Sequence, residues 1–331
     1  RPGCGGRGSP APARPSDHRL VTRPGRALLL ALAGLFVASS ALSAGTDEPD
    51  LAFGAYQRGH YLDAFHEALK RVEKDPNDGA AMALLGELTA SGLGVAPDLR
   101  KAADWFRLAS ARGDRNATYA LAMMTLEGKG VPMDRARAKS LLQQAAEAGQ
   151  PSAAYNLGLL ALGEETPEGD RRGARLIRQG AEAGVSEARY ALATLLRDGK
   201  GVPVDREAAA RLMGLAARDF YEPAEIEYAI MLFKGDGVAK DEAGAARIFL
   251  RAAARGNPVA QNRIARLYVA GRGVATNLVE AAAWNMLAKH AGRDDPWLDS
   301  ATANLSAQER EKALGLVRQR LSAFQLGITS P

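Results

Sequence analysis

The sequence predicts an all-α fold, an α/α superhelical solenoid of consecutive helical hairpins. A Gly-x-Gly-Val motif occurs five times, and its first glycines are separated by 36, 71, 36 and 36 residues. A period in this range is typical of repeat arrays, whose units bury their core against their neighbours. Because the long interval has room for one more unit without the motif, we expect six units. The paired glycines are Gly92 and Gly94, Gly128 and Gly130, Gly199 and Gly201, Gly235 and Gly237, and Gly271 and Gly273.

The first 44 residues resemble a secretory leader rather than part of the array. Arg23 and Arg26 precede an apolar run at residues 27–37, and small residues follow as far as Ala44. This is the pattern of a signal peptide, so we expect cleavage after Ala44, with retention as an N-terminal anchor as the alternative. The chain is then exported, with the periplasm as the expected compartment and an extracellular or inner-membrane-anchored location as alternatives.

The leader accounts for the net positive charge of the chain and contains its cysteine. The formal net charge of the sequence is +5, and residues 1–44 hold six arginines and one acidic residue, so the remainder is neutral. A neutral remainder gives no electrostatic reason to expect nucleic-acid binding. Cys4 is the only cysteine, so we expect no disulfide after cleavage. Residues 1–20 lack periodicity, and we expect translation to start near Val21, which N-terminal sequencing of the precursor would test.

Residues 45–77 are predicted to form a capping hairpin before the array. Small and aromatic side chains in the sequence after Leu51 fit two short helices that turn at Arg58, Gly59 and His60. Pro76 ends the second helix because proline cannot donate the next backbone hydrogen bond. Such a hairpin would cover the first apolar face of the array.

Each unit from residue 78 onward is predicted to contain two helices joined by the glycine loop. Small residues recur in every first helix, which allows the paired helix to approach closely. The second helix is expected to start six residues after the first glycine, where Asp or Asn can accept hydrogen bonds from free backbone N–H groups. These predicted N-caps are Asp98, Asp134, Asp205, Asp241 and Asn277.

The third unit and the C-terminal segment depart from this pattern. An acidic, proline-containing loop at residues 162–170 replaces the glycine loop, either through drift at a tolerant surface site or as a binding or hinge site. After Ala291 the period ends, and a break is expected at residues 294–297. Ser306 and Glu309 then form a capping box ahead of a helix that would cover the last repeat. Residues 292–331 are therefore predicted to be a C-terminal capping helix and tail.

Taken together, these motifs resemble the Sel1-like repeat, a relative of the tetratricopeptide repeat. The resemblance covers about residues 78–291 as six repeats, and residues 45–77 resemble half of a tetratricopeptide repeat. It implies a solenoid with first helices along its concave face and a role in assembling protein complexes rather than in catalysis. Exported bacterial members of this family are common, in agreement with the leader.

No group of residues in the sequence has the spacing of a catalytic, metal or cofactor site. His60, His66 and His290 lack ligand spacing and are expected on the surface. The Gly-x-Gly motifs follow helices rather than strands, which excludes a dinucleotide-binding loop. We therefore expect no enzyme activity, no metal and no cofactor.

By resemblance to tetratricopeptide arrays, one row of first-helix positions would face the concave groove. Tyrosines in three successive units would form an aromatic floor for a protein or peptide partner. Alternatively, these tyrosines pack between neighbouring helices and leave only their hydroxyl groups in water. The predicted groove residues are Tyr119, Tyr155, Tyr190, Met123, Leu159, Leu126, Ile230 and Arg266.

The sequence thus favours a non-enzymatic scaffold or adaptor in the bacterial cell envelope. The partner would be a protein or peptide, with no nucleic acid and with a membrane only if the leader is retained as an anchor. The alternative is a cell-wall protein, because some secreted relatives are linked to peptidoglycan or β-lactam binding or to hydrolysis. Those relatives carry paired cysteines in each repeat, whereas this chain has only Cys4. A β-lactam hydrolysis assay would separate the two.

Overall fold

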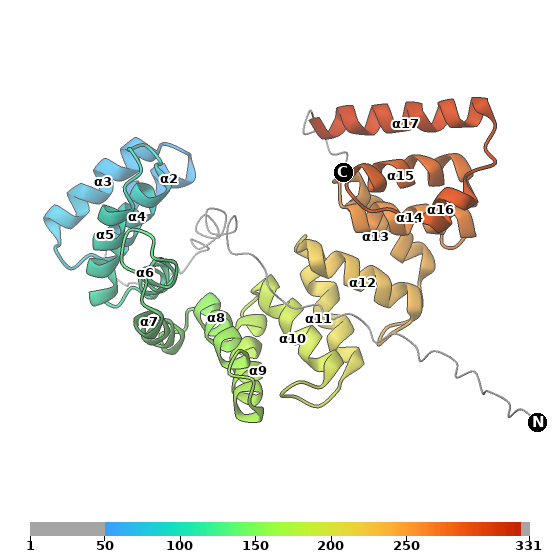
Figure 1. The fold of residues 1–331 in the computed structure, drawn as a ribbon. Coiled ribbons are helices and arrows are strands. Elements are labelled where there is room, and N and C mark those ends of the chain that lie inside the picture. Colours follow the sequence, from blue (N-terminus) through green and yellow to red (C-terminus); the bar gives the residue numbers. More distant parts are fainter. Residues whose placement is uncertain (1–49, 326–331) are drawn as a thin grey trace, which may run out of the picture. The chain divides into compact units, whose positions relative to one another are not determined.

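The computed structural model describes residues 50–325, and all regular elements in this range are α-helices (Figure 1). The all-α prediction is confirmed. The leader at residues 1–44, its expected cleavage site, Cys4, the start of the predicted capping hairpin at residues 45–49 and the C-terminal tail at residues 326–331 lie outside the described residues.

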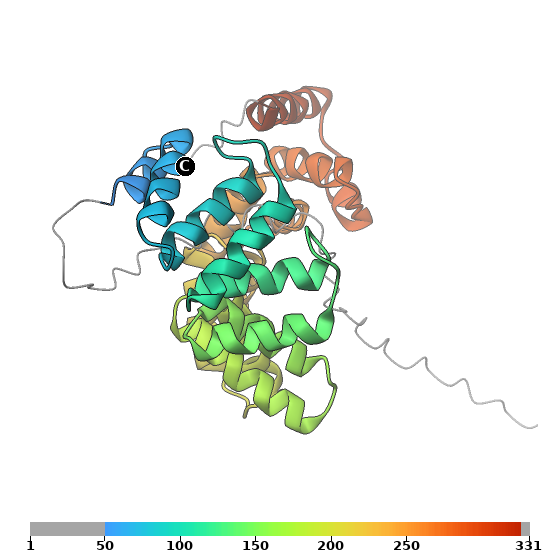
Figure 2. The ribbon, with the colours of Figure 1, turned by 90° about the vertical axis from the view of Figure 1, so that its left-hand side faces the viewer.

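Helical hairpins follow one another in chain order (Figures 1 and 2). The first helices of the six repeats are α4 (Gly79–Ser91), α6 (Arg115–Glu127), α8 (Pro151–Leu162), α10 (Ser186–Asp198), α12 (Glu222–Lys234) and α14 (Pro258–Ala270). The second helices are α5 (Leu99–Ala111), α7 (Arg135–Glu147), α9 (Pro167–Glu182), α11 (Arg206–Arg218), α13 (Glu242–Ala254) and α15 (Leu278–His290). The flanking helices are α2 (Leu51–Gln57), α3 (Tyr61–Lys74), α16 (Pro296–Ala301) and α17 (Ala307–Gln325). Each helix from α3 to α16 packs against the one before it, whereas α17 packs on α15.

Small side chains set the distance between the helices of a repeat. Ala81 and Leu85 on α4 are almost completely buried, and a Cβ atom at Gly86 would lie 2.6 Å from the Phe106 ring of α5. Because the gap is this narrow, one large side chain from one helix fills it and the opposing position must be small. The core therefore consists of alanines at the helix crossings, with Leu, Ile, Met and Phe between them.

The glycine loop both ends the first helix and contacts the preceding repeat. Gly235 follows α12 with φ of 76°, a left-handed conformation that glycine adopts at little cost. Gly237 also has positive φ, and a Cβ atom there would overlap the backbone carbonyl of Arg206, the first residue of α11. The second glycine of each other loop meets the backbone of the preceding unit in the same way, at Gly94, Gly130, Gly201 and Gly273.

The third repeat replaces its loop with a longer helix, which corrects the predicted loop at residues 162–170. Helix α9 has 16 residues, whereas the other second helices have 13. It begins at Pro167 because Thr166 caps it, accepting a hydrogen bond from the Gly169 N–H at 3.0 Å, and because proline suits the first helical position. The connection is therefore only residues 163–166.

The C-terminal segment contains a helix at the predicted break. Asp295 accepts a hydrogen bond from the Leu298 N–H at 3.3 Å, and Pro296 occupies the first position of α16. The same cap-and-proline arrangement that starts α9 therefore makes residues 296–301 helical. Ser306 and Glu309 form the reciprocal hydrogen bonds of a capping box before α17. Leu298 of α16 and Ala313 of α17 are fully buried.

Candidate functional site

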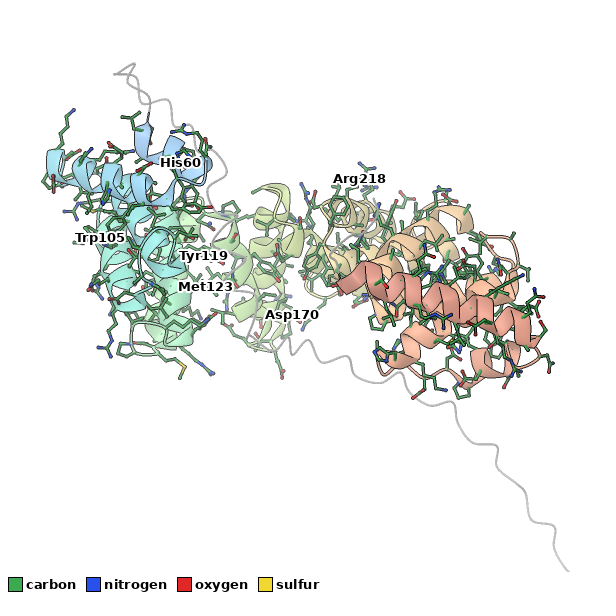
Figure 3. The ribbon with its side chains drawn as sticks, turned by 90° about the horizontal axis from the view of Figure 1, so that it is seen from above. His60, Trp105, Tyr119, Met123, Asp170 and Arg218 are labelled. Carbon is green, nitrogen blue, oxygen red and sulfur yellow. The ribbon has the colours of Figure 1, made fainter. Side chains whose placement is uncertain are left out.

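Tyr119 lies on α6 and is mostly packed into the repeat core. Only 7% of it is exposed, and its hydroxyl oxygen accepts a hydrogen bond from Asn156 Nδ2 of α8 at 3.1 Å. Burial raises the pKa of Tyr119 to about 12. Figure 3 shows Tyr119 beside Met123, one helical turn further along α6. The ring therefore links two successive first helices and offers little surface to a partner.

Tyr155 and Tyr190 are half-buried and border one core cluster shared by the third to fifth repeats. The Tyr190 ring contacts the ring of Tyr221, the residue before α12, with centroids 5.5 Å apart and planes at 60°. Burial raises the pKa of both Tyr155 and Tyr190, and neighbouring tyrosines add to the effect at Tyr155. The structure thus brings Tyr155, Tyr190 and Tyr221 together around one core cluster. Tyr119 is joined to the same helix as Tyr155 by its hydrogen bond with Asn156.

The aliphatic members of the predicted groove are more accessible than Tyr119. Leu159 on α8 is 40% exposed, while Met123 and Leu126 on α6 and Ile230 on α12 are half-buried. Met123, Leu159, Thr194 and Ile230 occupy the same position in successive repeats. We call the row of these four side chains the first-helix face.

Arg266 occupies the equivalent position in the sixth repeat, but it binds the C-terminal segment. Its guanidinium donates to both carboxylate oxygens of Asp295, at 2.7 and 2.9 Å, and lies 4.9 Å from the centre of the Trp297 ring. Asn262 Nδ2 donates to the same carboxylate at 2.7 Å. Arg266 therefore anchors α16 at the end of the array, a role that the sequence pattern did not indicate because α16 itself was not predicted.

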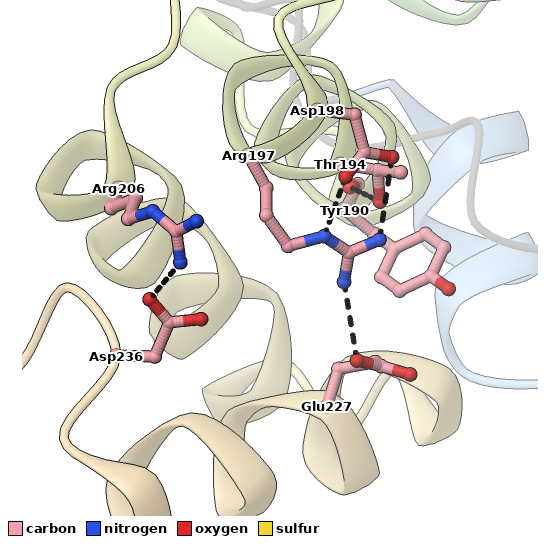
Figure 4. A network of polar contacts seen from close by, with 7 residues as sticks. All are labelled: Tyr190, Thr194, Arg197, Asp198, Arg206, Glu227 and Asp236. Atoms are coloured by element: carbon pink, nitrogen blue, oxygen red, sulfur yellow. Dashed lines mark hydrogen bonds and ion pairs between the residues drawn. The ribbon is translucent and has the colours of Figure 1, made fainter. Parts of the chain in front are cut away.

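Charged side chains border the first-helix face between the fourth and fifth repeats (Figure 4). Arg197 of α10 pairs with Asp198 at 2.9 Å and reaches Glu227 of α12 at 3.3 Å. On the second-helix side, Arg206 pairs with Asp236 at 2.6 Å. Arg197 with Glu227 and Arg206 with Asp236 each join residues 30 positions apart in successive repeats, and this recurring offset was the signal in the sequence that could have revealed them.

The predicted caps and loop glycines lie in structural positions. All five predicted N-caps accept hydrogen bonds from backbone N–H groups in the first turn of their helix. The first glycine of each loop follows its helix in the left-handed conformation. These residues shape the hairpins rather than presenting chemistry to a ligand.

The described residues 50–325 contain no cluster of three or more His, Cys, Asp or Glu side chains arranged to hold a metal ion. His60, His66 and His290 are exposed. Within the same residues no helix combines the length and the apolar character that crossing a membrane requires. What the described surface does offer is a row of partly apolar side chains with charged neighbours.

Solved structures that share this fold include two Sel1-type proteins. A Sel1 repeat protein from Oxalobacter formigenes is 23% identical over 73% of this chain and 97% of its own, with a TM-score of 0.61. A protective antigen present in uropathogenic Escherichia coli strains, which displays an SLR fold, is 24% identical over 84% of this chain and 68% of its own, with a TM-score of 0.52. A search of curated proteins found no match.

A family model described as Sel1 repeat matches six successive segments of the chain. The segments are residues 79–114, 115–150, 151–185, 186–219, 223–257 and 258–284. They begin with the first helix of each repeat, except that the fifth begins one residue inside α12, and together they cover more than half of the sequence. The atypical third unit is among them. The chain therefore belongs to the Sel1 repeat family.

Proposed function

We propose that this protein is a non-enzymatic scaffold or adaptor of the bacterial cell envelope, and that a protein or peptide partner binds along its first-helix face. Sel1 repeat proteins generally bind protein partners, and six such repeats make up most of this chain. The leader-like sequence of residues 1–44 supports export, so the partner would be another envelope protein.

The observation that carries the proposal is the row of partly exposed apolar side chains on successive first helices. Leu159, on α8 within this row, is 40% exposed. Met123 on α6 and Ile230 on α12 lie on either side of it and are half-buried. Arg197 and Glu227 provide charged groups at the side of the row. An apolar strip with a polar border is the usual composition of a protein interface.

A crosslinking pull-down from native envelope extract tests this proposal with two matched variants. Leu159→Asp places a charge on the first-helix face, whereas Leu215→Asp places one on α11, where Leu215 is 38% exposed. Because both side chains are similarly exposed, the two changes should disturb folding to a similar extent. We expect Leu159→Asp to lose a partner that the wild type and Leu215→Asp both retain.

The opposite pattern, or equal recovery of all partners by the three proteins, would contradict binding at this face. Circular dichroism of each variant establishes that the helices are intact before the pull-down is interpreted.

A further inference from the structure

A cleft lies between the second helices of the second and third repeats, α7 and α9, over part of α8. Its volume is about 840 Å³, within the range of ligand-binding pockets. Its side chains combine cations and amides with an apolar floor, and they include Lys139, Gln143, Leu157, Arg172, Arg175 and Leu176. The cleft is formed by second helices and by the far side of α8, apart from the first-helix face.

Two glycines of α9 allow this wall of the cleft to pack closely on α8. Gly173 and Gly180 occupy positions at which all five other second helices have alanine. A Cβ atom at Gly173 would lie 2.7 Å from Leu162 Cγ and 2.8 Å from the Gly158 carbonyl oxygen, and one at Gly180 would lie 3.1 Å from the Pro151 carbonyl oxygen. At Gly173, helix α9 therefore lies closer to α8 than an alanine would allow, on the side of α9 next to the cleft floor.

A carboxylate of the chain already occupies one end of the cleft. Glu164, from the short connection before α9, accepts from Lys139 Nζ of α7 at 3.4 Å and from the guanidinium of Arg172 on α9. The Arg172 hydrogen bond, followed by that of Lys139, lowers the pKa of Glu164. Cations from the two walls of the cleft thus converge on one carboxylate.

Arg175 lies one helical turn beyond Arg172 on the same wall and is exposed. Among the described residues, none forms a hydrogen bond or an ion pair with its side chain. The half-buried side chains of Leu157 on α8 and Leu176 on α9 form the adjacent floor. The lining contains three cations and two acidic groups, Glu147 and Glu164, so an unpaired positive charge stands beside an apolar surface.

We propose that this cleft is a second docking site, which binds an acidic peptide segment of a partner protein. A carboxylate of the peptide pairs with Arg175, as Glu164 pairs with Arg172, and an apolar side chain next to it packs on Leu157 and Leu176. Arginine suits this role because its planar guanidinium can hold a carboxylate through two hydrogen bonds. Glu164 keeps its contacts with Lys139 and Arg172 when the peptide binds, and these contacts hold the two walls of the cleft in place.

Fluorescence anisotropy with a short fluorescein-labelled peptide of alternating Glu and Leu residues tests the site on the full chain. The control peptide has Gln in place of Glu. We expect the acidic peptide to bind, and Arg175→Glu to weaken its binding by about tenfold or more through charge repulsion. The matched control Arg178→Glu alters an exposed arginine of the same helix that does not line the cleft, and it should bind within about twofold of the wild type.

The proposal would be overturned by no binding to the wild type, by equal loss of binding in the Arg175 and Arg178 variants, or by equal binding of the Gln peptide. The Leu159→Asp variant separates this site from the first-helix face, because it should bind the acidic peptide normally. Loss of peptide binding in Leu159→Asp would assign the peptide to the first-helix face instead.

Discussion

At the scale of single residues, the two glycines of each loop have different roles. Gly235 needs its left-handed backbone to end α12, and the nearest atoms to a Cβ added there belong to Lys240 of the same loop, with its Cβ at 3.2 Å. Gly237 has the same backbone requirement and also lies against the carbonyl of Arg206 in the preceding repeat. A side chain at Gly237 therefore affects the packing between repeats.

Gly237→Ala is expected to destabilise the protein more than Gly235→Ala. Both alanines must adopt positive φ, at a cost of roughly 1–2 kcal/mol each, and only the alanine at position 237 also overlaps backbone that cannot move away without separating two repeats. Urea denaturation of both variants measures the difference in the free energy of unfolding. Equal destabilisation would show that the contact between repeats contributes nothing.

Glu87 on α4 is a buried carboxyl group, only 3% exposed, that accepts a hydrogen bond from Ser91 Oγ at 2.9 Å. Burial raises its pKa. Its stabilising contribution is thus complete below the pKa of the unfolded state and is lost as the pH rises through the raised folded-state pKa.

Glu87→Gln is expected to stabilise the protein at pH 7, because glutamine stays neutral and its carbonyl can still accept from Ser91. The difference from the wild type should shrink towards pH 4, where the glutamate is protonated. Thermal denaturation at both pH values measures this. A glutamine variant less stable than the wild type at pH 7 would contradict the idea that burial of the Glu87 carboxyl group destabilises the folded protein at this pH.

The sequence predicted roles that depend on neighbouring residues better than roles that depend on residues in another repeat. Asp98 could be recognised as an N-cap from its spacing after the loop, because capping depends on the next few residues only. Whether Tyr119 faces the groove or packs between helices could not be decided in this way, because its position depends on contacts with the next repeat, such as that with Asn156. Arg266 likewise depends on Asp295, whose helix was not predicted.

At the scale of helices, charged contacts supplement the small-residue packing. Glu225 of α12 is completely buried and accepts hydrogen bonds from Arg251 of α13 at 2.8 and 3.2 Å and from Arg255. Both arginines are partly exposed, so they reach in from the surface to neutralise one buried carboxylate. The group ties α12 to α13 in the fifth repeat.

Glu225→Ala is expected to lower the free energy of unfolding by about 3 kcal/mol, because it removes the acceptor of both arginines and leaves a cavity. Glu222, at the start of the same helix α12, accepts an exposed hydrogen bond from Asn257, the N-cap of α14, and Glu222→Ala should cost less than about 1 kcal/mol. Chemical denaturation compares the two. Similar losses in both would show that the buried carboxylate has no special role.

The helices α9 and α16 mark the limit of prediction from a repeat pattern. Both start at a capping residue followed by proline, Thr166 with Pro167 and Asp295 with Pro296, where the sequence was interpreted as a loop or a break. The prolines suggested interruption, whereas their position after a cap favours the start of a helix. The close packing of α9 on α8 depends on contacts across the third repeat and could not be predicted locally.

At the scale of the whole molecule, the array needs covered ends because each repeat buries its core against a neighbour. Helices α16 and α17 provide this cover at the C-terminal end, where Leu305 and Ala313 pack with Ala282 and Ala283 of α15. Arg266 joins this cover to the last first helix through Asp295.

Removal of residues 292–331 is expected to expose the apolar side of α15, lower the melting temperature by roughly 5 °C or more and promote association. Size-exclusion chromatography and thermal denaturation of the shortened chain measure these effects. A monomer that melts like the full chain would contradict the capping role.

Hydroxyl-radical footprinting with the partner recovered by the pull-down tests the central claim most directly. Met123, Leu159 and Tyr190 are three reactive side chains on or beside the first-helix face, and Met133 in a loop and Leu215 on α11 serve as internal controls. Binding is predicted to protect the first three from oxidation and to leave Met133 and Leu215 unchanged. Protection of Met133 and Leu215 with none at Met123, Leu159 and Tyr190 would contradict binding along the first helices.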